Sequence, residues 1–358
     1  MTNVNKKNTY YPALDGLRVF SFFIVFLFHV PLDYSNLGWG GVNIFFALSG
    51  FLITEILINT KEKKSFFSTF YWRRSLRIFP IYYLLVIFIL LVFLIKKGYL
   101  PDATFGLLSY TSNYFYSNLN DEYVFMLHHT WTLAIEEQFY LIWPLVIYFL
   151  PTRYLLGTSF LFILLSMAYR TLSVFNPAMS FVHLPAQIDS LVLGAVVAIL
   201  KVKGDIHKGN FKIYRNSAIA IGTLGIVSVF LVLAKQNSIS IMQTYAEFGK
   251  SVDYTKSIIG IHTFFFIAVF SIGLILNCLY ANNLLNKIFS HSVMVHLGKI
   301  SYGLYLYHYP VLAVTRFFVP NKIALFFIAL IVTIIISEIS YYTIEKYFRD
   351  VKEKFKYT

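Results

Sequence analysis

Long apolar runs alternate with short polar stretches along almost the whole chain. Ten of these runs have roughly the length that an α-helix needs to cross the hydrocarbon core of a bilayer, about 20 residues. They lie at residues 14–32, 39–58, 79–95, 132–150, 154–172, 187–200, 215–234, 257–280, 297–317 and 323–343. The sixth run is short, and we expect it to be tilted, broken or re-entrant. The pattern predicts an all-α, polytopic transmembrane helical bundle.

The composition agrees with this class of protein. Of the 358 residues, 58% are hydrophobic and only 13% are charged, about half the charged share of a soluble domain. The first run lacks a small-residue cleavage site and therefore predicts a retained anchor. The single cysteine, Cys278, excludes an intramolecular disulfide and argues against a cysteine-based metal site. The predicted outer loops are too short for a separate catalytic domain, so we expect any chemistry inside the bundle.

Basic residues are distributed unevenly between the two predicted faces of the membrane. In a soluble protein the net charge of +13 would suggest a nucleic-acid partner, but topology explains it here. Twenty Lys and Arg residues fall on one face and eight on the other. Because positively charged loops stay on the inner side, we expect both termini in the cytoplasm. We expect a membrane domain over residues 10–345 and a basic cytoplasmic tail at residues 346–358.

Arg18 and His29 are ionisable residues within the first run. Eleven residues of α-helix turn through about 1100°, so the two side chains share a helix face, about 16.5 Å apart along the axis. Ionisable residues inside a span are costly and indicate a functional site. Two plainer roles stay open: Arg18 as an interfacial anchor that reaches lipid phosphates, and His29 as a helix-end histidine bonded to backbone.

Three arginines precede the third run. Arg74 and Arg77 share a face if their segment is helical, and Arg73 adjoins them. The planar fork of arginine suits phosphate groups, which indicates a phosphate-bearing cytosolic ligand. The positive-inside rule explains the same arginines without any ligand.

Glu136 and Glu137 interrupt the fourth run, and no basic residue lies near them in the sequence. They must therefore face a cavity, water or partners on other helices. A carboxylate beside His29 would orient the imidazole and raise its basicity. The chain shows no P-loop, no HExxH zinc motif and no GxSxG elbow.

Further polar and aromatic residues within the runs are candidates for contact with a substrate. They are Asn43, Trp131, Asp189, Tyr302 and His308. Interfacial aromatic girdles explain Trp131 and Tyr302 equally well. For Gly50 we favour close helix packing.

Six motifs, in order, resemble those of the acyltransferase-3 family of integral membrane acyltransferases. They read DGLR–x10–H, GVNIFFALSGFLIT, WRRSLRIFP, HTWTLAIEEQFYLIWP, IDSLVLGA and GKISYGLYLYHYP. The resemblance implies a ten-span bundle that moves an acyl group, usually acetyl, from cytosolic acyl-CoA to a glycan hydroxyl on the far side. Some members carry an added extracytoplasmic esterase-like domain. This chain is expected to be of the stand-alone type, like lipopolysaccharide O-antigen O-acetyltransferases of the bacterial inner membrane.

The resemblance also implies roles for individual residues. The arginine–x10–histidine pair of the family falls on Arg18 and His29, its RxxR pair on Arg74 and Arg77, and its acidic residue on Glu136.

The chain departs from the family pattern at three places. Asn43 stands where the second-span motif more often has an acid, Thr132 replaces the serine of a WSL motif, and Ala186-Gln187 stand where an arginine is frequent. If the second-span acid supports the histidine in other members, Glu136 must do so here.

Together these observations predict a membrane O-acyltransferase that uses acetyl-CoA as co-substrate and needs no metal. Arg18, Arg73, Arg74 and Arg77 would bind the CoA phosphates, His29 would act as general base, and Glu136 would orient it. Asn43, Trp131, Asp189, Tyr302 and His308 would contact the acceptor. The expected partners are acyl-CoA, a glycan or lipid-linked glycan and membrane lipids, with a homodimer as an option and no nucleic acid.

Three alternatives stay open at this point. The acyl group could be carried on His29, Ser49 or Ser301 before transfer. The chain could instead be a transporter or flippase of glycan intermediates, or a membrane sensor without turnover.

Overall fold

The computed structural model describes residues 10–30, 36–116, 124–236 and 260–358. Within these ranges the regular elements are helices, as the apolar pattern predicts. The long helices are α1 (Pro12–His29), α2 (Gly40–Thr60), α3 (Phe66–Lys97), α5 (Trp131–Phe149), α6 (Leu155–Leu172), α8 (Leu184–Lys203), α9 (Phe211–Gln236), α12 (Thr263–Tyr280), α15 (Ser301–Phe318) and α16 (Lys322–Tyr342). The short helices are α4 (Thr104–Leu108), α7 (Pro177–Val182), α13 (Leu284–Phe289), α14 (Ser292–Lys299) and α17 (Ile344–Lys352). Three 3-10 turns occupy Asn36–Trp39, Val124–Thr130 and Gly260–His262.

Each predicted run overlaps one long helix, while residues 31–32 of the first run and 257–259 of the eighth lie outside the described residues. Among the described residues, eight helices are long and apolar enough to cross a membrane. Helices α5 and α15 have 19 and 18 residues, and their apolar sequence is interrupted by Glu136 and Glu137 in α5 and by His308 and Arg316 in α15. The chain is therefore an all-α, multi-pass membrane protein, and both of these helices contribute to the site described below.

Three predicted boundaries were wrong. Helix α3 begins at Phe66, so the arginine motif lies within a 32-residue helix that continues through Pro80 rather than in a loop. The short sixth run is an unbroken 20-residue helix, α8. The ninth run is divided at Ile300, and Lys299 ends α14 instead of lying inside a span. Apolar runs mark only the most hydrophobic part of a helix, so helical turns that carry charge were read as loops.

Helix α2 lies in the middle of the bundle, in contact with α1, α5, α8 and α12. It meets α8 through two glycines. A Cβ on Gly50 would collide with the carbonyl oxygen of Leu191, and a Cβ on Gly194 would collide with that of Ala47. The packing role predicted for Gly50 is confirmed, because only glycine lets the two backbones approach this closely.

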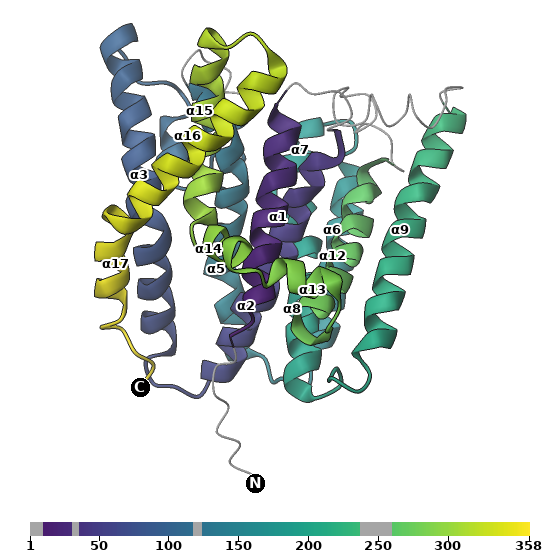
Figure 1. Ribbon diagram of the computed structural model, residues 1–358. Helices are drawn as coiled ribbons and strands as arrows, with labels where there is room; N and C mark the ends of the chain where they lie inside the picture. Colours follow the sequence, from purple (N-terminus) through teal and green to yellow (C-terminus); the bar gives the residue numbers. More distant parts are fainter. Residues whose placement is uncertain (1–9, 31–35, 117–123, 237–259) are drawn as a thin grey trace.

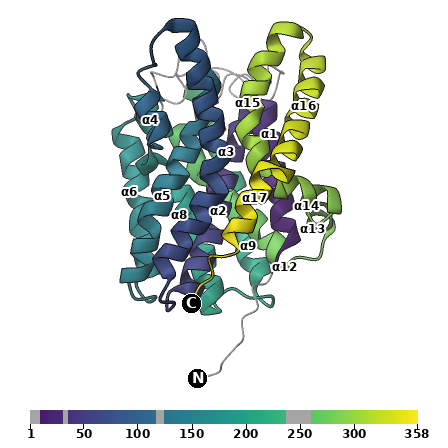
Figure 2. The same ribbon diagram turned by 90° about the vertical axis from the view of Figure 1, so that its left-hand side faces the viewer.

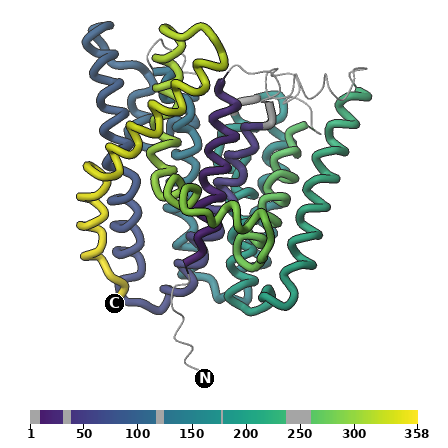
Figure 3. Tube along the Cα trace, in the orientation of Figure 1, coloured from purple at the N-terminus to yellow at the C-terminus, as the bar shows by residue number. Residues whose placement is uncertain are grey.

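The beginning of α1 and the C-terminal residues lie at the same end of the bundle (Figures 1 and 3). From there α17 packs along the arginine-bearing part of α3, as Figure 2 shows. Most of the predicted basic tail is thus a helix docked on α3. At the centre of Figure 1, α13 and α14 cross α1.

Candidate active site

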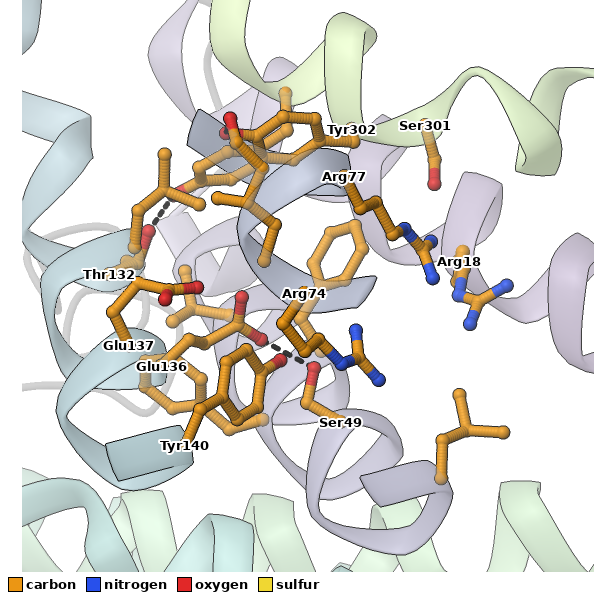
Figure 4. Close-up of a pocket in the computed structure, with 17 residues that line it drawn as sticks. Arg18, Ser49, Arg74, Arg77, Thr132, Glu136, Glu137, Tyr140, Ser301 and Tyr302 are labelled. Carbon is orange, nitrogen blue, oxygen red and sulfur yellow. Dashed lines mark hydrogen bonds between the residues drawn. The ribbon is translucent and has the colours of Figure 1, made fainter. Parts of the chain in front are cut away.

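A pocket lies between α2, α3, α5 and α15, with one side chain contributed by α1 (Figure 4). The empty space among its lining residues is about 790 Å³, including the part open to solvent. Figure 4 shows the guanidinium groups of Arg18, Arg74 and Arg77 on one side and the carboxylates of Glu136 and Glu137 on the other. Residues from five helices therefore bring five charged side chains together at one pocket within the bundle.

Arg74 and Arg77 lie one turn apart on α3 and face the pocket, as their spacing predicted. Within the described part of the chain neither guanidinium has a hydrogen-bond or ion-pair partner. Arg74 only stacks over the ring of Tyr140, 5.1 Å from its centroid. The positive charge of Arg77 also affects a neighbouring side chain. Burial, together with repulsion from Arg77, lowers the pKa of Lys352 in α17. Two unpaired guanidinium forks at one pocket suit an anionic ligand with several oxygen atoms.

Arg18 also lines the pocket, but it has a protein partner. Its guanidinium forms an ion pair with Asp15, one turn earlier on α1, and Tyr10 donates to the same carboxylate at 2.7 Å. Asp15 is part of the DGLR motif, whose acid was not considered as a site residue. Arg18 therefore has an ion-pair partner, whereas Arg74 and Arg77 have none among the described residues.

Arg73 was predicted to bind CoA, and the structure gives its guanidinium different contacts. It donates to the carbonyl oxygens of Phe355 at 2.7 Å and Lys352 at 3.3 Å, and it pairs with Glu353 at 3.3 Å. Since it points to the C-terminal segment and does not line the pocket, it anchors that segment to α3.

Glu136 faces the pocket but does not orient His29. Its carboxylate accepts a hydrogen bond of 2.5 Å from the Ser49 hydroxyl on α2. The neighbouring Glu137 also lines the pocket, and its Oε1 is buried without a hydrogen-bond partner among the described residues. A second cavity between α3 and α5 shares Glu137, Arg74 and Tyr140 with the first.

His29 ends α1 and contacts α15 instead of α5. Its Nδ1 lies 3.2 Å from Nε2 of His308, and its ring packs edge-on against Tyr309 at 4.8 Å. Arg316 donates to the backbone carbonyl of His29. The predicted dyad of His29 with Glu136 is thus replaced by a pair of imidazoles.

The pocket and the histidine pair are connected through α15. Thr132 and Tyr305 line the pocket, and their hydroxyl groups are hydrogen-bonded to each other at 2.8 Å. The backbone carbonyl of Tyr305 lies 2.5 Å from Nδ1 of His308, which in turn contacts His29. Contacts of α15 therefore link the edge of the pocket to His29, which does not itself line the pocket.

Of the other residues predicted to bind substrate, Tyr302 lies at the pocket, whereas Trp131 and His308 lie in the interior of the bundle. Tyr302 lines the pocket and donates to the carbonyl of Ile78 at 2.9 Å. Trp131 packs against Phe46 and Phe181 in the core. His308 is fully buried beside His29.

Asn43 and Asp189 lie in helix interfaces away from the pocket. Asn43 donates to Gln187 and Ser190 of α8, at 3.1 and 2.9 Å. Asp189 forms an ion pair with Arg170 of α6, and both side chains have 0% exposure. Their polar groups are taken by protein partners, so we assign these two residues to holding α2, α6 and α8 together.

Sequence reasoning overlooked Thr132 and Tyr140 as pocket residues. A signal for both was present, because residues 132, 136 and 140 recur every four positions and so share a face of α5 with Glu136. The same helical spacing relates Tyr305 to Ser301 and Tyr302 on α15, whereas nothing in the local sequence pointed to the contact of Ser49 with Glu136. Among the described residues no group of three or more His, Cys, Asp or Glu side chains is arranged to hold a metal ion.

The fold and site define a polytopic membrane protein with a pocket lined by three arginines and two glutamates. A family model described as an acyltransferase domain matches residues 11–342, and the chain belongs to the acyltransferase-3 family. Its relatives include the O-acetyltransferase OatA of Staphylococcus aureus strains NCTC 8325 and COL, each 30% identical over 94% of this chain. The matched region spans 57% of those relatives' length. No solved structure matches the chain.

Proposed function

We propose that this chain is a membrane O-acyltransferase that moves an acetyl group from acetyl-CoA to a hydroxyl of a cell-surface glycan. The observation that carries the proposal is that Arg74 and Arg77 line one pocket without an ion-pair partner among the described residues. Tyr305 of the same pocket contacts His308, which contacts His29. The family supports acyl transfer, and the relatives named O-acetyltransferases support acetyl as the group that is moved.

The donor side of the proposal depends on charge. The phosphates of CoA are multivalent anions, and paired arginine forks bind such groups through charge-assisted hydrogen bonds. Arg18 adds a third positive group, held in place by Asp15. The axial distance from Arg18 to His29, about 16.5 Å on the unbroken helix α1, is comparable to the reach of a pantetheine arm.

The chemistry of the proposal centres on His29. Its imidazole takes the proton from the acceptor hydroxyl as the oxygen attacks the thioester carbonyl carbon. The tetrahedral intermediate then collapses, the carbon–sulfur bond breaks, and the thiolate of CoA leaves with the proton returned by the imidazolium. General base catalysis of this kind contributes roughly 10²–10⁴-fold in rate.

Acyl transfer through Ser49 is the alternative mechanism that a contact favours. Its hydroxyl is hydrogen-bonded to Glu136, which resembles a nucleophile next to a base. We rank direct transfer first because it needs no additional intermediate. Rapid acid quenching after mixing with labelled acetyl-CoA would reveal an acyl-serine by mass spectrometry.

We further propose a glycan or lipid-linked glycan as acceptor and the bacterial cytoplasmic membrane as location, with lipopolysaccharide O-antigen as the first acceptor to test. These proposals rest on the motifs of the chain and on the family.

The test is acetyl-CoA turnover and CoA binding by the purified protein in lipid nanodiscs, with and without a glycan extract. Removing a charge-assisted hydrogen bond costs about 1.5–3 kcal/mol, so Arg74→Gln and Arg77→Gln should each raise the Kd for CoA roughly 10- to 150-fold. Arg73→Gln is the matched control, because its guanidinium binds the C-terminal segment, and its Kd should stay within about threefold of wild type. His29→Ala should bind CoA normally without transferring acetyl.

Two results would overturn the proposal. If wild type neither binds nor hydrolyses acetyl-CoA, a transporter of glycan intermediates becomes the better explanation. If all three arginine variants behave alike, the arginines serve topology and the pocket is not a CoA site.

A further inference from the structure

His308 lies on α15, directly beside His29, the last residue of α1. Its side chain has 0% exposure, yet both ring nitrogens have a partner. Nδ1 lies 2.5 Å from the backbone carbonyl oxygen of Tyr305, and Nε2 lies 3.2 Å from Nδ1 of His29. A buried histidine with these two contacts cannot also bind a substrate through its nitrogens, so another role is needed.

The partners determine where the hydrogen atoms sit. A carbonyl oxygen only accepts, so Nδ1 of His308 must carry the hydrogen of that contact. In a neutral imidazole the other nitrogen then has a lone pair, and Nε2 of His308 can only accept. The hydrogen between the two rings must therefore come from Nδ1 of His29, which leaves the lone pair of His29 on Nε2.

The surroundings favour the neutral form of His308. Its ring lies 5.1 Å from the ring of His29 and 5.1 Å from that of His129, while Arg316 adds a positive charge at the His29 carbonyl. In the described part of the chain no carboxylate forms an ion pair with any of the three imidazoles. A proton on fully buried His308 would be an uncompensated charge, which is costly.

His129 does not take part in the hydrogen bond between Nδ1 of His29 and Nε2 of His308. Its Nε2 lies 3.0 Å from the carbonyl oxygen of Leu306 and must donate to it. Its Nδ1 is buried and has no hydrogen-bond partner among the described residues. Of the two neighbouring imidazoles, His308 is thus the one that contacts Nδ1 of His29. The backbone carbonyl of Val25 is a further acceptor for the His29 ring, and like Nε2 of His308 it requires the hydrogen on His29.

We infer that His308 is a positioning residue that holds His29 in the Nδ1–H tautomer and so presents Nε2 as the proton-accepting atom. This inference rests on the proposed role of His29 as general base. After proton transfer, the imidazolium of His29 still donates its Nδ1–H to Nε2 of His308. A neutral imidazole therefore supplies the orienting contact that the sequence had suggested for Glu136. Helix α15 also fixes the end of α1, since Arg316 binds the His29 carbonyl.

The direct test is solid-state NMR of ¹⁵N-histidine-labelled protein in lipid, with the His29 signals identified by their loss in His29→Gln. Wild type should show the Nδ1–H pattern for neutral His29. In His308→Leu, which keeps a similar volume without an acceptor, this pattern should give way to a mixture or to Nε2–H. His296→Leu is the matched control, because His296 pairs with Glu338 elsewhere, and it should leave the His29 signals unchanged.

Kinetics give an independent measurement. In His308→Leu we expect kcat to fall at least about tenfold, within the range of general base catalysis, while the KM for acetyl-CoA stays unchanged. His308→Gln, whose amide oxygen can accept from His29, should restore most of kcat. An Nε2–H pattern for His29 in wild type would overturn the inference, as would wild-type kcat in folded His308→Leu. If wild type transfers no acetyl group, the proposed function fails, whereas the NMR pattern still decides the role of His308.

Discussion

The ion pair between Arg170 and Asp189 should be a structural tie between α6 and α8, and its removal should destabilise the protein. Both side chains have 0% exposure. Arg170 Nη1 also lies 3.1 Å from Asp189 Oδ1, and it donates to the carbonyl of Ala186 at 2.6 Å. Asp189→Leu would leave the guanidinium buried without its counter-charge.

The expected cost follows from this burial. Removing one partner of a buried, hydrogen-bonded ion pair costs about 3–5 kcal/mol, which raises the unfolding equilibrium constant roughly 10²–10⁴-fold. Replacing both partners by apolar residues of similar volume is often neutral or stabilising. The double variant Arg170→Met/Asp189→Leu should therefore regain at least wild-type stability.

Reversible unfolding in SDS, followed by tryptophan fluorescence, measures these changes in the free energy of unfolding. The reasoning about the pair would be refuted if Asp189→Leu unfolded at the same SDS fraction as wild type. Activity adds a second criterion. A stable double variant that had lost acetyl transfer would show that Asp189 contacts the acceptor, as the sequence had suggested.

The remaining predictions concern the pocket and its supports. Ser49→Ala should lower kcat less than about tenfold, the cost of one ordinary hydrogen bond, and complete loss of turnover would instead support an acyl-serine. Gly50→Val should block insertion or folding, because its Cβ would meet the Leu191 carbonyl. Gly157→Val, where nothing lies within 4 Å of the added Cβ, should fold normally, and equal yields of the two variants would contradict this account. Arg73→Ala should expose the C-terminal segment to limited proteolysis without weakening CoA binding; an unchanged digestion pattern would argue against the anchoring role.

Most of the fold could be predicted from local sequence. Among the described residues, ten long helices overlap the ten apolar runs, since a membrane helix satisfies its own backbone hydrogen bonds and its length follows from the bilayer. Where prediction was wrong, at the start of α3 and at Ile300, the helix continues or ends among polar residues. Whether a helix continues or ends among such polar residues depends on what packs against them, and hydropathy does not report this.

The candidate site was predictable only in part. The face shared by Arg74 and Arg77 and the inward position of Glu136 follow from helical period and from the cost of charge in lipid. The hydrogen-bond and ion-pair partners of these residues could not be predicted from helical period or from the cost of charge in lipid. Arg73 adjoins Arg74 in sequence yet binds the C-terminal segment, because consecutive helical residues point in directions about 100° apart.

The sequence by itself determined the long apolar helices, the residues that must avoid lipid and the resemblance to a family. Only the tertiary structure decided which polar groups meet: Ser49 with Glu136, Arg170 with Asp189, and His29 with His308. These pairs join residues 87, 19 and 279 positions apart, on helices whose order in space is set by side-chain packing. A buried polar group must find a partner, but its own sequence neighbourhood does not specify which helix provides it.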